Sequence, residues 1–145
     1  MYRNIMIGLN KSAASQRALK RAIDLAGQFE ATLTAVAVVP APPPYAAYAA
    51  ALSAEAPRIM EGDQQAFFVD LLGMARREAA QHAIEIETVL SGGSAVVSVF
   101  DAVRTNQIDL LVLGIQPELE LLGWMSGSTA HELAQRVACD VLGVH

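Results

Sequence analysis

Leu110-Leu111-Val112-Leu113-Gly114 is the run of residues that decides the fold. It is apolar throughout and too short for a typical helix, so we expect a buried strand that ends on a glycine. After the loop 115–126, Gly127-Ser128-Thr129 opens an amphipathic segment, and Val141-Leu142-Gly143-Val144 forms another strand-like run. A strand that leads through a loop to the start of a helix can offer backbone N–H groups to an anion.

The composition restricts the class of protein. The 145 residues are 53% hydrophobic and 17% charged, which predicts one globular domain over residues 1–145. A net charge of -5 without a basic run predicts no nucleic-acid partner. Cys139 is the single cysteine, so an intrachain disulfide is excluded. Neither a signal-peptide pattern nor an apolar run of membrane-spanning length is found, and we expect a cytoplasmic protein without membrane insertion.

Strand-like and helical patterns alternate along the chain. Apolar and β-branched runs predict strands at residues 4–9, 31–39, 84–90, 109–114 and 140–144. Apolar residues at helical spacing predict helices that begin near Ser12 or Ser15, that cover 58–83, and that follow Gly93 and Gly127. Five of the six prolines fall within 40–57, which predicts a loop there.

This alternation predicts an α/β fold with three layers and a five-stranded parallel sheet in the order 3-2-1-4-5. The Ile-Glu alternation of residues 84–87 places the third strand at one edge. In this order the direction of winding changes between the first and fourth strands, and ligands bind beyond the carboxyl ends of the strands at such a point. Asn10 and Gly114 flank the predicted crevice.

The residues around this crevice resemble those of a known family. Gly114, Pro117 and Gly127-Ser128-Thr129 have the spacing of the G-x2-G-x9-G-[ST] signature of the universal stress protein family, and the likeness covers the whole chain. The resemblance implies an adenine nucleotide alpha hydrolase-like fold, a homodimer, a role in stress response and, in many members, binding of ATP or AMP. The family's nucleotide-binding positions would correspond to Asn10, Val38, Gly114, Gly127, Ser128 and Thr129.

Two residues depart from the family pattern and make the ATP-binding motif degenerate. Pro117 stands in place of the second glycine and has no N–H to donate to a phosphate. Asn10 stands in place of an aspartate, although its amide oxygen still accepts a hydrogen bond from a ribose hydroxyl. Glu118 and Glu120 would repel a triphosphate, and no Lys or Arg occurs between Asp109 and Arg136. AMP, adenosine or another small ligand therefore suits the loop better than ATP.

The same features also have structural interpretations. Gly114 can serve a tight strand exit, because glycine tolerates positive φ. Ser126 or Ser128 can cap the last helix, and Asn10 can bond to its own backbone in an Asx turn. The loop 119–125 either joins the core or forms a docking surface for a partner protein, because it carries the large apolar residues Leu119, Leu121, Leu122, Trp124 and Met125.

The last strand predicts a dimer interface. Val141, Leu142 and Val144 form an apolar edge with no later strand to cover it, and such an edge favours pairing with another chain. Antiparallel pairing with a second copy across a two-fold axis would satisfy its backbone groups.

The sequence predicts binding and not turnover. No nucleophile–base pair, carboxylate pair or metal cluster can be assembled from the motif residues, so no catalytic or metal-binding residue is assigned. We expect a homodimeric regulatory protein that binds an adenine nucleotide or another small ligand. One alternative is an interaction module of the same fold without nucleotide, and another is a weak nucleotide hydrolase that uses Ser128, Thr129 and a divalent ion. A phosphorelay receiver or a flavin-binding protein is a further alternative, although Asn10 and Val89-Leu90 stand where a receiver needs acidic residues.

Overall fold

The computed structural model describes residues 1–41, 51–52, 56–116 and 127–145. In this part of the chain, five parallel strands form one sheet in the order β3-β2-β1-β4-β5, as the sequence predicts. The strands are β1 (Asn4–Leu9), β2 (Thr32–Pro40), β3 (Ile86–Gly93), β4 (Leu110–Gly114) and β5 (Asp140–Val144).

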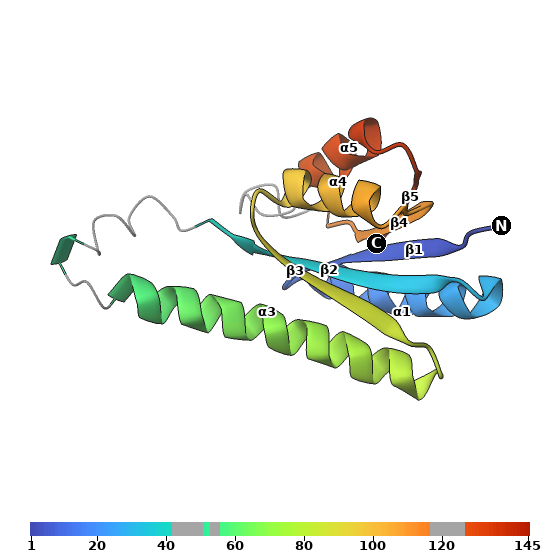
Figure 1. Cartoon of the computed structure of the whole chain (residues 1–145). Helices are drawn as coiled ribbons and strands as arrows, with labels where there is room; N and C mark the ends of the chain where they lie inside the picture. Colours follow the sequence, from blue (N-terminus) through green and yellow to red (C-terminus); the bar gives the residue numbers. More distant parts are fainter. Residues whose placement is uncertain (42–50, 53–55, 117–126) are drawn as a thin grey trace.

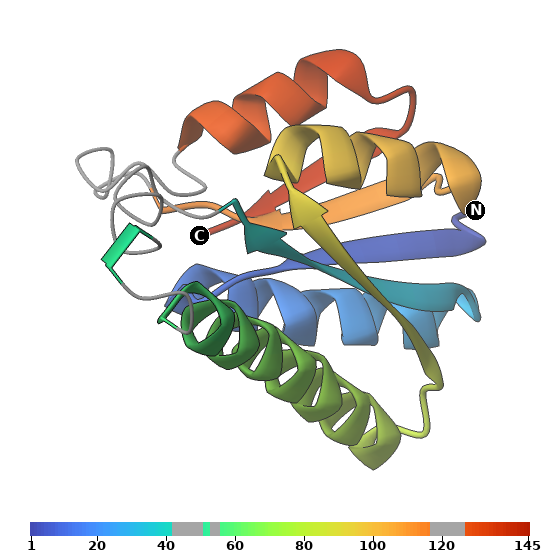
Figure 2. The ribbon, with the colours of Figure 1, turned by 60° about the vertical axis from the view of Figure 1, so that its left-hand side comes forward.

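Helices cover both faces of the sheet, which gives the three layers of the predicted α/β fold (Figure 1). One face carries α1 (Ala13–Phe29) and α3 (Ala56–Gln81), and the opposite face carries α4 (Ala95–Thr105) and α5 (Gly127–Arg136). The chain winds outward from β1 to β3 through α1 and α3. It then crosses to β4 through α4 on the other face (Figure 2). The winding direction therefore changes between β1 and β4.

The residues at the two ends of α1 determine where this helix begins and ends. The Ser12 hydroxyl accepts a hydrogen bond from the Ser15 N–H and caps the first turn. Small and aliphatic residues then recur on one buried face, from Ala14 to Ala26. The helix ends at Glu30, whose φ of 53° is left-handed and whose N–H donates to the Ala26 carbonyl.

Two hydrophobic cores lie on the two faces of the sheet, because successive residues of a strand point to opposite sides. In the central strand β1, Ile5, Ile7 and Leu9 pack toward α1 and α3, whereas Met6 packs toward α4 and α5. Every residue of β1 from Ile5 to Leu9 is buried, as expected for a strand with neighbours on both sides and helices on both faces.

The third strand lies at a sheet edge as predicted, but the predicted bounds 84–90 are wrong. Ala83 has a φ of 57° and the Ile84 N–H still bonds to the Ala79 carbonyl, so the end of α3 holds the chain until Ile86. At the other end, Ser91 to Gly93 pair with Val38 to Pro40 and lengthen the strand. The glycines after Leu90 therefore belong to the strand and not to the turn.

Polar contacts tie the amino ends of the strands together. The Asp109 carboxylate accepts hydrogen bonds from the backbone N–H groups of Arg3 and Asn4. The Tyr2 hydroxyl donates to Asp140 at 2.7 Å, and this hydrogen bond raises the pKa of Tyr2. These contacts join the amino ends of β1, β4 and β5, at the edge of the sheet opposite the predicted crevice.

The strand β5 lies at the other edge of the sheet, as the dimer prediction requires. Leu142 and Val144 pack toward the core beneath α1, and Val141 packs toward the core beneath α5. All three are only partly buried. The edge thus offers both backbone groups and apolar surface, and the dimer interface itself stays a prediction.

Candidate functional site

The carboxyl ends of β1, β2 and β4 meet at one edge of the sheet. Gly8 of β1 pairs with Leu113 of β4, and Leu9 of β1 pairs with Ala37 of β2. Asn10, which follows Leu9, therefore lies beside the last residues of β4 on one side and beside Val38 on the other. The fold brings the predicted residues Asn10, Val38 and Gly114 together at the switch point.

Gly114 is required by close packing. A Cβ atom on Gly114 would lie 2.5 Å from the backbone carbonyl carbon of Ala14, 2.5 Å from the Ser15 nitrogen and 2.7 Å from the Ala14 oxygen. Among the described glycines only Gly93 has a positive φ, so the interpretation of Gly114 as a conformational glycine is wrong. The first turn of α1 packs directly on the end of β4, and only glycine leaves room for it.

Asn10 organises the turn between β1 and α1. Its side-chain oxygen accepts a hydrogen bond of 2.8 Å from the Ser12 N–H, which is the predicted Asx turn. Its own N–H donates at 3.0 Å to the hydroxyl of Ser15, a side chain that is fully buried. An amide oxygen has two lone pairs, so this oxygen can still accept a second hydrogen bond. The Asx turn is confirmed, and the contact of Asn10 with a ligand stays a prediction.

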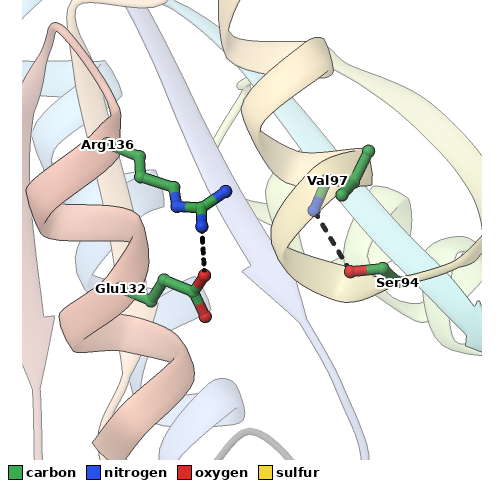
Figure 3. Close-up of polar contacts among 4 residues, drawn as sticks. All are labelled: Ser94, Val97, Glu132 and Arg136. Carbon is green, nitrogen blue, oxygen red and sulfur yellow. Dashed lines mark hydrogen bonds and ion pairs between the residues drawn. The ribbon is translucent and has the colours of Figure 1, made fainter.

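The described helices α1, α3, α4 and α5 all begin on this side of the sheet, because each follows the carboxyl end of a parallel strand. α1 begins after Ser12, and α5 begins at Gly127. α4 begins after Ser94, whose hydroxyl accepts from the Val97 N–H (Figure 3). A helix start carries partial positive charge and unpaired N–H groups, so this edge favours an anionic ligand.

The predicted motif is described only in part. The backbone of Gly127 and Ser128 forms the start of α5, and Thr129 beside it is half-buried. Pro117, Glu118, Glu120 and the loop 119–125 lie outside the described residues. At the carboxyl end of β4, a groove of about 350 Å³ lies between α5 and the strands β4 and β5, lined by Leu113, Ile115, Ala130, His131, Ala134, Val141 and Gly143.

Lys11 supplies a positive charge that the sequence interpretation missed. Its Nζ lies 4.8 Å from the ring centre of Phe67 and 5.9 Å from that of Phe68, both on α3. Contacts of this kind contribute about 0.5–1 kcal/mol at exposed sites. Lys11 lies outside the segment from Asp109 to Arg136, to which the sequence argument about cations applies. The adjacency of Lys11 to Asn10 was the signal available for finding it.

The described residues contain no group of three His, Cys, Asp or Glu residues able to hold a metal ion. Their one ion pair joins Arg136 to Glu132 at 2.8 Å on the exposed side of α5 (Figure 3). Burial raises the pKa of the Cys139 thiol, which disfavours a reactive thiolate. In the same part of the chain, no helix is long and apolar enough to cross a membrane.

The fold and this edge of the sheet define the class of protein. The model of the universal stress protein family matches residues 1–145, so the chain belongs to the universal stress protein family. The adenine nucleotide alpha hydrolase-like fold expected from the resemblance is thereby confirmed. Comparison with curated protein sequences gives no match.

Solved structures of the same family superpose over nearly the whole chain. Universal stress protein UspA from Lactobacillus plantarum has a TM-score of 0.80 and 25% identity, covering 99% of this chain and 98% of its own. A universal stress protein from Arabidopsis thaliana with AMP bound has a TM-score of 0.70 and 16% identity, covering 98% and 90%. The universal stress protein from Archaeoglobus fulgidus in complex with dAMP has a TM-score of 0.65 and 16% identity, covering 99% and 98%.

Proposed function

We propose that this chain binds an adenine nucleoside monophosphate, such as AMP, in the crevice at the carboxyl ends of β1 and β4. The observation that carries the proposal is the meeting of Asn10, Val38 and Gly114 at the switch point of the sheet. Helix starts at the same edge favour an anion. Relatives with the same fold hold AMP and dAMP.

Each residue of the crevice would have a defined role toward such a ligand. The second lone pair of the Asn10 amide oxygen accepts from a ribose hydroxyl. The backbone of Val38 in β2 pairs with Ser91 of the edge strand β3 and would contact the edge of the adenine ring. The N–H groups of Gly127, Ser128 and Thr129 would donate to the phosphate at the start of α5.

A monophosphate fits this chain better than ATP. Pro117 removes one N–H donor from the phosphate-binding segment, and Glu118 and Glu120 add negative charge to it. Each further phosphate group adds negative charge that these residues do not offset. We therefore propose AMP as the stronger ligand and ATP as the weaker one.

Isothermal titration with AMP, adenosine and ATP, the last with and without magnesium, tests the proposal. We expect saturable heat with AMP and a weaker response with ATP. Asn10→Ala should weaken AMP binding, whereas Asn10→Asp keeps an oxygen acceptor for both Ser12 and the ribose and should retain it. Far-UV circular dichroism of both variants checks that the fold is intact. If none of the three ligands gives a binding heat at millimolar concentration, the proposal is refuted.

We also propose that the protein acts as a homodimer through β5, within the cytoplasm, as a regulator in stress response. The open edge of β5 and the partly buried Val141, Leu142 and Val144 support the dimer. Family membership supports the stress role. No turnover chemistry is required, because ligand occupancy alone can change the affinity of a regulator for its partner.

A second candidate is a protein-interaction module of the same fold that binds no nucleotide. Specific observations favour it, because the packing against α1 fully accounts for Gly114 and the Asx turn accounts for Asn10. In this case the loop 119–125 would be the partner surface. Mass spectrometry of small molecules released from the natively purified protein separates the two candidates, since an adenine nucleotide in stoichiometric amount would exclude the second.

A further inference from the structure

Lys11 lies in the turn between β1 and α1, next to Asn10. It follows Asn10 and precedes Ser12, the N-cap of α1, so its backbone is fixed by the hydrogen bonds on either side of it. Its side chain is exposed and extends over the rings of Phe67 and Phe68 on α3. A flexible lysine stem therefore starts from a fixed backbone position beside Asn10, a residue of the proposed site.

The ammonium group of Lys11 is held by aromatic faces and not by a carboxylate. Among the residues that the structure describes, no acidic oxygen lies within ion-pair distance of Lys11 Nζ. Phe67 is 42% exposed and Phe68 is 4% exposed, so the ammonium group lies over one ring at the surface and one ring of the core. An exposed cation–π contact is weaker than a hydrogen-bonded contact between an ammonium and a phosphate.

We propose that Lys11 is the specificity-determining residue that selects a phosphorylated nucleotide over the free nucleoside. The inference rests on the proposed function and adds to it the source of the positive charge. When a nucleotide enters, the ammonium exchanges the rings of Phe67 and Phe68 for a phosphate oxygen. This exchange supplies the cation that the segment between Asp109 and Arg136 lacks.

Binding of AMP and adenosine to four proteins tests the inference. Wild type is compared with Lys11→Met, Lys11→Arg and Lys20→Met. Methionine keeps a long stem that packs on aromatic rings but removes the charge. Lys20 is the other lysine of the chain and lies exposed two to three turns along α1, so its variant controls for net charge.

Lys11→Met should weaken AMP binding about five- to tenfold and leave adenosine binding within about twofold. Lys11→Arg and Lys20→Met should both bind AMP nearly as tightly as wild type. Added salt should weaken AMP binding to wild type more steeply than to Lys11→Met, because salt screens an exposed charge pair. Thermal denaturation confirms that each variant is folded.

The results separate this inference from the proposed function. If wild type binds neither AMP nor adenosine, both fail. If wild type binds AMP and Lys11→Met binds it equally well, only the role of Lys11 fails. An equal loss of AMP and adenosine affinity in Lys11→Met would assign Lys11 to the structure of the turn and would also overturn the inference.

Discussion

Replacing Gly114 by alanine tests whether close packing or ligand binding requires this glycine. The added Cβ would lie 2.5 Å from two backbone atoms of α1 and 2.7 Å from a third. Backbone cannot rotate aside as a side chain does, so α1 or β4 must shift. Overpacking costs about 1–3 kcal/mol, and the rigid neighbours place Gly114→Ala at the upper end, about 3 kcal/mol. For a chain of this size, that lowers Tm by about 6–12 °C.

Urea denaturation followed by circular dichroism, without ligand and at fixed protein concentration, measures this effect. The midpoint should fall while the m value stays constant, because the surface exposed on unfolding hardly changes. Gly62→Ala is the matched control. It lies in α3 with nothing within 4 Å of the added Cβ and is exposed, so it should stabilise the protein by about 0.5–1 kcal/mol.

An unfolding free energy of Gly114→Ala within about 0.5 kcal/mol of wild type would refute the packing explanation. If such a stable variant also lost AMP binding, the glycine would serve the ligand alone. A strongly destabilised Gly114→Ala beside a stabilised Gly62→Ala would show that the end of β4 needs glycine even without a ligand.

Three further substitutions test other parts of the account. Ser12→Ala removes the cap of α1 and should lower the unfolding free energy by about 1 kcal/mol in urea denaturation; an unchanged midpoint would contradict the capping role. Val141→Lys places charge at the β5 edge and should halve the mass found by light scattering, whereas Val97→Lys on the exposed side of α4 should not; an unchanged mass for Val141→Lys argues against pairing through β5. Pro117→Gly combined with Asn10→Asp restores one N–H donor and one carboxylate, so ATP should bind more tightly in calorimetry; no gain would mean that these residues do not limit the site.

The sheet could be predicted from the sequence because each strand carries its own signal. The apolar run at Leu110 to Gly114 and its position after an amphipathic helix suffice to place a buried parallel strand. The register of the edge strand β3 could not be predicted in the same way. Its end at Gly93 depends on pairing with Pro40, a residue distant in sequence, and its start depends on the left-handed Ala83.

The candidate site shows the same division between local and non-local information. The Asx turn of Asn10 is local, and the sequence predicts it as one of two alternatives. The close contact of Gly114 with Ala14 joins segments about one hundred residues apart, and only the fold reveals it. The stacking of Lys11 on Phe67 and Phe68 likewise depends on how α3 lies across the sheet.

Amide chemical shifts recorded by NMR during a titration with AMP test the central claim most directly. The account predicts saturable shifts that cluster at Asn10, Val38, Gly114 and Thr129, which belong to four separate segments and meet at one edge of the sheet. Small or no shifts are expected at the opposite edge, around Asp109. Shifts confined to that opposite edge, or no shifts at millimolar AMP, would contradict the assignment of this crevice as the ligand site.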